Sequence, residues 1–488
     1  MSSIADPYQH VRSRLNIVDA LAKVQPDDLL PVRPEDSVRG ELGRRFSDYL
    51  VRSIENGSYD PTPAYSVTVP KSRLTTRPAA LLPLNDRVVY EAIVRALMPR
   101  VERYLLGEGI VFWPRGTDRD KRWSEFERSV ISPDYNYVAR SDIAGFYESI
   151  DHGELGDAIV RATGYRDLAD ALSAFLERIM GSRRGLPQGL SPSDTLGTLY
   201  LAELDFVMVR NGYRYVRHGD DVRIGVANYD QGCRALRLME ATLRRLGLLL
   251  NVEKTRVLRS GTYANSMASH ETTLDHTRKK IVNAKIANLR DNECALGTAI
   301  REAGMEQLEW DLFYHATVDL EDAIEELRPT LQPDEIEIAK ELFLDAVQRQ
   351  PGTKNALSRE VFHQQLVWSL IRLSAGRSDA GVGAIAGLLK SFPEETTVLC
   401  SYLNALASEP SAAGAVAGQL EIALCAQNTD WETARMVAVL KRVPHIASRA
   451  ILTKLKTAIG AFRHLPIPSK RLTLGAAIRL RSSCDVHP

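Results

Sequence analysis

The sequence has few cysteines and no excess of charge of either sign. Its five cysteines are scattered over 488 residues, and no two of them form a CxxC pair. This argues against a zinc site or a disulfide framework and favours a reducing cytosol. Lys and Arg together number 62, as do Asp and Glu, so the formal net charge is zero. Any contact with nucleic acid must therefore come from local clusters of basic residues.

Long apolar runs are also absent. The N-terminal stretch MSSIADPYQHVRSRLNIVDA lacks the apolar core of a signal peptide, and no uncharged apolar stretch is long enough to span a bilayer. We therefore expect a cytoplasmic protein without a membrane partner. Hydrophobic residues at 44% and charged residues at 25% are ordinary values for a soluble globular protein, and the length suggests two or three domains.

The character of the sequence changes near residue 260. Residues 1–260 mix strand-like and helix-like segments, whereas residues 285–488 follow a helical period almost throughout. Helical segments such as EIEIAKELFLDAVQRQ are separated by short breaks, which is typical of stacked helical pairs, although no repeat motif is clear enough to name. The polar residues 261–284 are interpreted as a connector. A plain helical scaffold is an equal alternative for the second half.

The order of elements in the first half indicates an α+β fold. A strand that ends at Asp142 is followed by a helix over 191–209, a hairpin over 213–226, a helix over 230–247 and a strand, turn and strand over 248–258. This order is the split βαβ arrangement. In that arrangement the first strand lies beside the hairpin, so we expect Asp142 to face the hairpin tip despite their separation in sequence.

Two adjacent carboxylates, Asp220 and Asp221, stand at the tip of this hairpin. Like charges placed side by side cost free energy unless a cation or solvent compensates for them. One interpretation is a Gly-Asp turn with solvated acids, because turns of this composition are common. The other is a metal site completed by Asp142, since nucleotidyl transfer uses two cations about 4 Å apart. Mg²⁺ prefers carboxylate oxygens, water and substrate phosphates, and Mn²⁺ is a possible substitute.

Four segments resemble motifs A to D of reverse transcriptases in order and spacing. They are SDIAGFYESIDH (141–152), GLPQGLSPS (185–193), HGDDV (218–222) and LGLLLNVEKT (246–255). Upstream, residues 69–93 are similar to the fingers motif. The resemblance is closest to bacterial reverse transcriptases of the abortive-infection and defence-associated groups. It implies right-hand polymerase fingers and palm over 1–260, followed by an all-α helical-repeat domain over 285–488 that replaces the thumb.

The resemblance also assigns roles at the acidic site. It places Asp142, Asp220 and Asp221 on the metal-binding acids, with the backbone carbonyl of Ile143 as a further ligand. Lys254 falls on the motif D lysine, a candidate to protonate the departing pyrophosphate. Outside this context, a lysine in such a position is more often a solvated turn residue.

Further residues fall on the nucleotide site. Lys71 and Arg77 match the fingers residues that grip the incoming triphosphate, a role that suits a flexible lysine and a forked arginine. The alternative is that they are two basic residues on the surface without a substrate role. Phe146 and Tyr147 are expected at the sugar, and Gln188 offers an amide to the substrate.

Motif C departs from the family pattern, because His218 and Gly219 stand where reverse transcriptases usually carry Tyr and a small residue. The sequence GDD is better known from viral RNA-dependent RNA polymerases, so RNA synthesis is an alternative. Tyr147, five residues after the motif A acid, decides for a DNA product, because its bulky ring would collide with a 2′-OH. The role of His218 stays open between packing under the hairpin and contacting the primer end.

We expect local basic residues to bind the template and primer. The alternative interpretation for each is an arginine that is solvated on the surface and binds nothing. The candidates are Arg115, Arg119, Arg183, Arg184 and Arg217.

These features together predict a Mg²⁺-dependent, reverse-transcriptase-like DNA polymerase that adds deoxynucleotides and acts, by family resemblance, in antiphage defence through abortive infection. Its partners would be dNTPs and a nucleic-acid template and primer, or a noncoding RNA, with homo-oligomerisation, protein priming and untemplated synthesis left open. The alternatives are an RNA polymerase of the same palm fold and a catalytically inactive nucleic-acid-binding scaffold.

Overall fold

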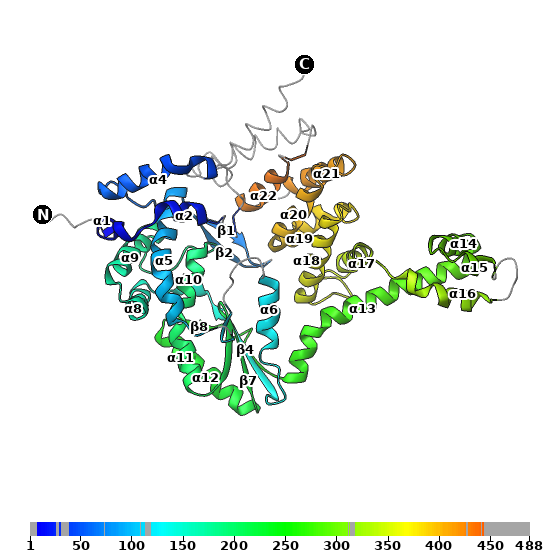
Figure 1. Ribbon diagram of the computed structural model, residues 1–488, viewed down its shortest axis with the longest axis horizontal. Helices are drawn as coiled ribbons and strands as arrows, with labels where there is room; N and C mark the ends of the chain where they lie inside the picture. Colours follow the sequence, from blue (N-terminus) through cyan, green and yellow to red (C-terminus); the bar gives the residue numbers. More distant parts are fainter. Residues whose placement is uncertain are drawn as a thin grey trace, which may run out of the picture. The chain divides into compact units, whose positions relative to one another are not determined.

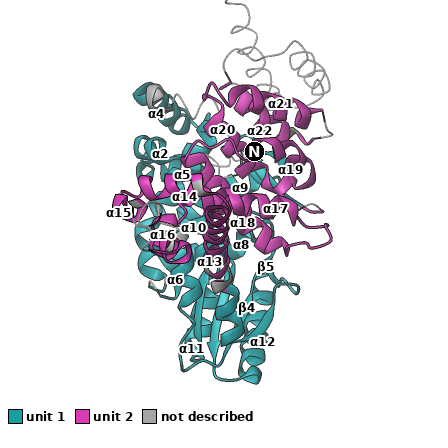
Figure 2. Ribbon diagram, turned by 90° about the vertical axis from the view of Figure 1, so that its right-hand side faces the viewer, with its two compact units in different colours: residues 1–69, 76–266 teal, residues 70–75, 267–488 magenta. Residues whose placement is uncertain are grey.

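The computed structural model divides the chain into two compact units. The first comprises residues 1–69 and 76–266, and the second comprises 70–75 and 267–488 (Figure 2). Among the described residues, no helix is both long enough and apolar enough to cross a membrane. The structure describes residues 7–25, 29–30, 39–72, 74–107, 109–112, 119–310, 312, 318–425, 428–440 and 442–443.

A five-stranded sheet lies at the centre of the first unit. Its strand order is β3-β6-β7-β4-β9, in which β6 and β7 form an antiparallel hairpin and β4 is antiparallel to both β7 and β9. A second, two-stranded sheet pairs β5 with β8. These strands are β3 (Val111–Phe112), β4 (Tyr137–Ser141), β5 (Ile143–Ala144), β6 (Arg214–His218), β7 (Asp221–Val226), β8 (Leu249–Leu250) and β9 (Arg256–Arg259).

Helices pack with this sheet into one hydrophobic core. Helix α12 contacts β4, β7, β8 and β9, and α11 contacts β6 (Figure 1). Helix α8 begins at the cap Asp151, whose carboxylate accepts bonds from the N–H groups of Gly153 and Glu154, and it ends at Gly164 in the left-handed conformation. The helices are α5 (Leu84–Tyr104), α6 (Arg119–Arg128), α7 (Phe146–Ser149), α8 (His152–Thr163), α9 (Arg166–Met180), α10 (Ser191–Tyr200), α11 (Ala202–Arg210) and α12 (Tyr229–Arg245).

The N-terminal part of the first unit is helical and packs on α5 and α9. A separate two-stranded sheet, β1-β2, follows it. The bounds are α1 (Pro7–Val11), η1 (Arg12–Arg14), α2 (Ile17–Lys23), α4 (Arg39–Glu55), β1 (Tyr65–Pro70) and β2 (Thr76–Leu81).

The split βαβ order predicted from the sequence is present as β4, α10 and α11, the β6–β7 hairpin, α12, and β8 with β9. The helix expected over 191–209 is divided in two at Leu201, so that α10 and α11 are separate helices. Because β4 pairs with β7, the end of the first strand is brought to the tip of the hairpin.

Beyond residue 266, the described part of the second unit consists of helices and the short connections between them. The segment interpreted as a connector lies within one long helix, α13 (Ser260–Asp291). The C-terminal part of α13 packs with α14 and α16, and α17 to α22 share a larger core. The helices are α14 (Glu293–Glu302), α15 (Glu306–Trp310), α16 (Leu320–Leu327), η3 (Arg328–Leu331), α17 (Glu335–Gln348), α18 (Arg359–Ala375), η4 (Val382–Ala384), α19 (Ile385–Ser391), η5 (Pro393–Glu395), α20 (Thr396–Leu406), α21 (Ala413–Leu424) and α22 (Asp430–Leu440).

Candidate active site

The hairpin tip is a two-residue turn formed by Gly219 and Asp220. The register pairs His218 with Asp221 across the hairpin. Gly219 has φ of +60°, as the first position of a two-residue II′ turn requires, and glycine adopts this conformation without strain. The turn therefore fixes Asp220 at the tip and Asp221 at the start of β7.

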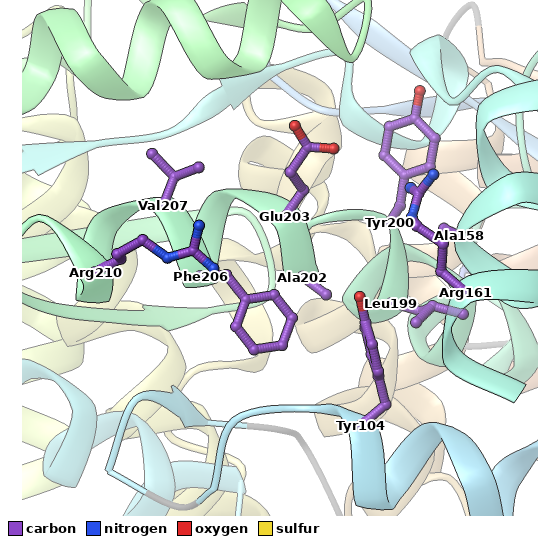
Figure 3. A pocket seen from close by; sticks show the side chains of 10 residues that line it. All are labelled: Tyr104, Ala158, Arg161, Leu199, Tyr200, Ala202, Glu203, Phe206, Val207 and Arg210. Carbon is purple, nitrogen blue, oxygen red and sulfur yellow. The ribbon is translucent and has the colours of Figure 1, made fainter.

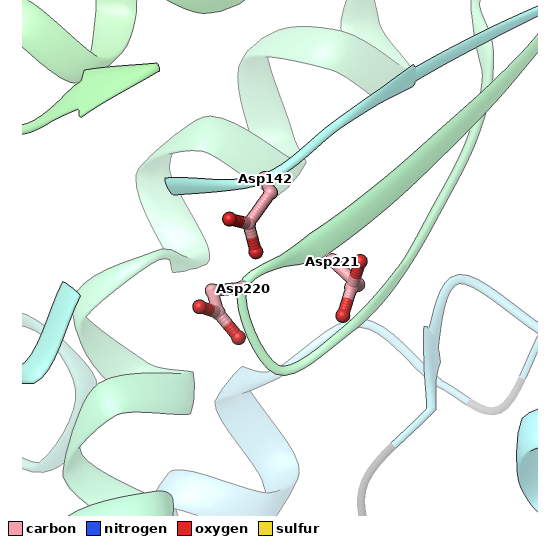
Figure 4. Close-up of side chains that lie close together, drawn as sticks. All are labelled: Asp142, Asp220 and Asp221. Atoms are coloured by element: carbon pink, nitrogen blue, oxygen red, sulfur yellow. The ribbon is translucent and has the colours of Figure 1, made fainter. Parts of the chain in front are cut away.

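Asp142 joins these two acids from the neighbouring strand. Ser141, the last residue of β4, pairs with Val222 of β7, so Asp142 emerges beside the hairpin tip (Figure 4). Asp142, Asp220 and Asp221 each offer a carboxylate oxygen, and these oxygens all lie within 4.8 Å of one another. The side chain of Asp142 is buried, and those of the other two acids are half-buried. Such a set of hard oxygen ligands fits a divalent cation such as Mg²⁺.

Burial and mutual repulsion act on these carboxylates. Burial raises the pKa of Asp220 to about 7, and the charges of Asp142 and Asp221 add to the increase. Burial also raises the pKa of Asp221, although the nearby guanidinium of Arg223 opposes this. A bound cation would relieve the repulsion and return the acids to their ionised form.

The turn after β8 holds Asp142 in place. The amide of Asn251 donates to Asp142 Oδ2 at 3.0 Å, and the Asn251 N–H donates to the Asp142 carbonyl at 2.8 Å. Lys254 Nζ lies 3.1 Å from the same carboxylate oxygen. Pairing of β5 with β8 aligns this turn, because Ile143 lies opposite Leu250. The sequence predicted Lys254 here and missed Asn251, for which its position three residues before Lys254 was the one available signal.

Arg223, two residues after Asp221, is a second residue that sequence reasoning missed. Its Nη1 lies 3.5 Å from Asp221 Oδ1, and its Nε donates to the hydroxyl of Tyr263 at 3.2 Å. The guanidinium also lies 5.1 Å from the ring centroid of Phe126. Since alternate residues of a strand share a face, a basic residue at this spacing from Asp221 was the signal that could have found it.

Arg77 and Lys71, the residues expected to bind the triphosphate, differ in burial. Arg77 on β2 is half-buried, and burial lowers its pKa while the charge of Asp220 opposes that change. The carboxylate of Asp220 is thus close enough to influence this guanidinium. Lys71 is exposed in the turn after β1, where its N–H donates to the Thr75 carbonyl.

A backbone hydrogen bond between Tyr147 and Leu186 joins motif A to motif B. The Leu186 N–H donates to the Tyr147 carbonyl at 2.8 Å, and Gln188 is half-buried in the loop that follows. The Tyr147 hydroxyl donates to Asp194 Oδ1 at 2.6 Å. Burial raises the pKa of Tyr147, and the charges of Asp194 and Asp220 contribute to the increase. The phenol is therefore neutral and electrostatically coupled to the acidic cluster.

Residues 69–285 match the family described as "Reverse transcriptase (RNA-dependent DNA polymerase)". The chain carries a reverse transcriptase domain. It is therefore an enzyme of the nucleotidyltransferase class, an RNA-directed DNA polymerase. The matched region contains the acidic cluster, Lys71, Arg77, the loop of Gln188 and Lys254.

A solved structure, that of apo telomerase from Candida tropicalis, is 10% identical to this chain, and the alignment covers 91% of this chain and 74% of the telomerase chain with a TM-score of 0.33. A score this low does not establish a common fold. A comparison with curated proteins gives no match.

The expectation that Arg217 binds nucleic acid is wrong. Its side chain is 0% exposed, and its Nε and Nη2 donate to the two carboxylate oxygens of Asp205, each at 2.7 Å. Nη2 also donates to the Thr198 carbonyl at 2.8 Å. Arg217 is buried because α11 covers this face of β6, so it stabilises the palm and cannot reach a phosphate.

The expectation that Phe146 contacts the nucleotide is also wrong. Its side chain is 4% exposed and belongs to the hydrophobic core of the reverse transcriptase domain. Its ring lies where a side chain at Gly197 of α10 would be, since a Cβ there would come within 2.9 Å of it. Phe146 thus anchors α7 against α10, and only its neighbour Tyr147 lies toward the acidic cluster.

The remaining basic candidates have different positions. Arg183 and Arg184 are exposed in the loop before Leu186, where Arg183 lies 3.8 Å from Glu177, so their role on nucleic acid stays a prediction. Arg119 is the first residue of α6. Arg115 lies outside the described residues.

His218 packs under the hairpin. Its ring centroid lies 5.2 Å from that of Trp123 and 5.9 Å from that of Phe126, both on α6. Of the two roles left open for this residue, the packing role is the one that the geometry favours.

A cavity of about 310 Å³ lies elsewhere in the reverse transcriptase domain, among α5, α8, α10 and α11 (Figure 3). Tyr104 and Phe206 contribute aromatic walls, and Arg161, Glu203 and Arg210 contribute charged groups. The three acids do not line it. The cavity is thus separate from the acidic cluster.

Proposed function

We propose that this enzyme adds deoxynucleotides to a growing strand at the cluster of Asp142, Asp220 and Asp221. The observation that carries this proposal is the approach of three carboxylates within 4.8 Å inside the reverse transcriptase domain. Bound Mg²⁺, or Mn²⁺ in its place, would activate the primer hydroxyl and neutralise the triphosphate. Asp142, Asp220 and Asp221, together with the Ile143 carbonyl, would hold the metal through their oxygen atoms.

The chain's own residues would then bind substrate and move a proton. Arg77 and Lys71 bind the triphosphate by charge-assisted hydrogen bonds, and Gln188 supports the incoming nucleotide. The 3′-OH releases its proton to solvent as its oxygen bonds to the α-phosphorus. The bond to pyrophosphate breaks, and Lys254 donates a proton to that leaving group. Its ammonium lies 3.1 Å from Asp142, which supports this role.

Tyr147 selects the sugar in this proposal. Its ring would contact the 2′ position of an incoming nucleotide, so that deoxynucleotides enter and ribonucleotides collide. The coupling of the Tyr147 phenol to Asp220 supports a position beside the reacting groups. A ribonucleotide-using enzyme of the same palm fold remains the second candidate, because of the Gly-Asp-Asp turn.

We further propose that the enzyme acts in antiphage defence by abortive infection, with residues 1–260 as fingers and palm, 261–284 as connector and 285–488 in place of a thumb. The resemblance of motifs A to D to the defence-associated groups and the helical second unit support this role. The primer, whether nucleic acid or a protein tyrosine, and the need for a template are open within the proposal.

Purified full-length enzyme tests the chemistry. Incorporation of dNTPs and rNTPs is measured with Mg²⁺ on RNA and DNA templates and without template. We expect dNTP incorporation by the wild type and by Asp170→Asn, a matched change of an exposed carboxylate on α9, and none by Asp220→Asn. Wild-type activity in Asp220→Asn contradicts the site, and a preference for rNTPs favours the RNA polymerase alternative.

The biological role needs a separate experiment. Cells that carry the wild-type gene should resist phage infection, and cells that carry Asp220→Asn should form plaques like cells without the gene. Any DNA that remains after the purified protein is digested with protease and RNase is sequenced to identify the product. Equal protection by both genes would contradict a defence role for DNA synthesis.

A further inference from the structure

Tyr147 is held at its hydroxyl by a residue that lies in a different motif. The phenol donates to Asp194 Oδ1 at 2.6 Å, and Asp194 is a half-buried residue in the first turn of α10. Because burial and the neighbouring charges of Asp194 and Asp220 raise the pKa of Tyr147, the phenol keeps its proton and acts as the donor. Charge-assisted bonds of this kind are short and strong.

The same helix also leaves space for the ring. Asp194 and Gly197 are three residues apart, so they lie on one face of α10. A Cβ at Gly197 would lie 3.6 Å from Tyr147 Cε1 and 2.9 Å from Phe146 Cε1. The absence of a side chain at this position therefore lets the Phe146 ring lie directly against α10, with the Tyr147 ring beside it.

The segment that contains Asp194 is held in place by hydrogen bonds of its neighbour Ser193. The neighbouring Ser193 donates its hydroxyl to the Pro187 carbonyl at 2.7 Å, and its Oγ lies 2.9 Å from the hydroxyl of Tyr90, a fully buried residue of α5. On the other side, the backbone of Tyr147 accepts the Leu186 N–H at 2.8 Å. Tyr147 is thus held at its backbone and at its hydroxyl.

We propose that Asp194 is a positioning residue that sets the preference for deoxynucleotides by fixing the ring of Tyr147. This inference rests on the proposed function, in which Tyr147 excludes the 2′-OH. A tyrosine bonded only at its backbone can change its side-chain rotamer, and a ring that turns aside admits a ribose. The bond to Asp194 holds the ring in the blocking rotamer while a nucleotide binds.

The test compares variants that keep or remove this one bond. Asp194→Ala removes the acceptor, Tyr147→Phe removes the donor and keeps the ring, and Asp194→Asn keeps an acceptor oxygen. The kcat/KM values for matched dNTP and rNTP are measured for each full-length variant, with Asp170→Ala as the control for loss of an exposed carboxylate.

We expect Asp194→Ala and Tyr147→Phe each to raise relative rNTP use about tenfold, the effect of a charge-assisted bond. Asp194→Asn, which keeps a neutral acceptor, should raise the ratio less than Asp194→Ala, and the control should keep the wild-type ratio. The double variant should match either single variant, because both changes break the same bond. A residue with only a structural role would lower dNTP turnover without a change in the dNTP to rNTP ratio.

An unchanged ratio in active Asp194→Ala and Tyr147→Phe enzymes overturns the inference and leaves the proposed function intact. Additive effects in the double variant also overturn it. If Asp194→Ala does not fold, the comparison of Tyr147→Phe with Asp194→Asn decides the question. A wild-type enzyme that incorporates no dNTP overturns the proposed function itself, and this inference with it.

Discussion

Two groups of charged residues lie at the β6–β7 hairpin, each completed by residues from other elements, and their charges are balanced to different degrees. Arg217 and Asp205 are fully buried and matched one to one, with two bonds of 2.7 Å between them. At the tip, three carboxylates are opposed by the cations of Lys254 at 3.1 Å and Arg223 at 3.5 Å, and the pKa of Asp220 is still raised to about 7. One group is fully compensated, and the other keeps residual repulsion.

The difference suggests separate roles. The buried pair serves the stability of the fold, and the acidic cluster serves function. A buried ion pair is tolerated when each charge has its partner and its hydrogen bonds. A cluster with unrelieved repulsion destabilises the chain alone and becomes favourable when a divalent cation binds. Variants of the two groups should therefore have opposite consequences for stability and activity.

The largest expected effect is the loss of nucleotide incorporation in Asp220→Asn. Removal of one ligand withdraws several kcal/mol of charge stabilisation, so the rate should fall by at least about 10³-fold. In metal-free buffer the melting temperature should hold or rise, because one repelling charge is gone. Single-nucleotide incorporation and thermal melting measure the two effects, and a large fall in melting temperature would contradict the comparison.

Arg217→Met should lower the stability of the fold. It leaves the Asp205 carboxylate buried without its cation, which costs about 3–5 kcal/mol in the free energy of unfolding. The double variant Arg217→Met/Asp205→Asn should recover part of this loss, since it also removes the stranded charge. Urea unfolding measures both, and a stability close to that of the wild type for Arg217→Met would show that the pair is not essential to the palm.

Lys254→Ala should lower kcat about 10²-fold, the lower end of the usual contribution of a general acid. The solvent deuterium isotope effect on kcat should also change, because the residue proposed to donate the proton is removed. Lys340→Ala on α17, an exposed lysine, is the matched control. A reduced kcat with an unaltered isotope effect would instead assign Lys254 to the support of Asp142.

The smallest expected effect is on the pH dependence of stability in metal-free buffer. Since the folded-state pKa of Asp220 is raised from its usual value of 3.8 to about 7, its contribution to stability is present below about pH 4 and is lost as pH rises through 7. The wild type should therefore lose stability relative to Asp220→Asn as the pH rises across this range. A difference that is constant with pH would contradict the repulsion.

Sequence patterns predicted the acidic cluster because its geometry follows from local rules. A strand that ends at Asp142 and a hairpin with Gly219 at its turn place three carboxylates together once β4 pairs with β7. Lys254 followed from the motif D resemblance. These residues depend on strand pairing, which alternation and turn residues indicate.

The remaining residues depend on tertiary contacts that no local pattern encodes. Arg217 is buried because β6 is covered on the face that meets α11, and the sequence does not reveal which face of a central strand a helix covers. Phe146 is buried because Gly197, far along the chain, leaves space for its ring. Asn251 and Asp194 are polar residues in a turn and a helix start, where capping and solvation explain them equally well until the fold is known.

The most direct test of this account is the stabilisation that Mg²⁺ gives to the chain at pH 8, where the acids repel one another most. We expect the melting temperature of the wild type, and of the Arg217→Met/Asp205→Asn variant, to rise with Mg²⁺ concentration. In Asp220→Asn the rise should be largely absent, although its melting temperature without metal is at least that of the wild type. An equal Mg²⁺-dependent rise in Asp220→Asn would contradict the assignment of the three carboxylates as the metal site.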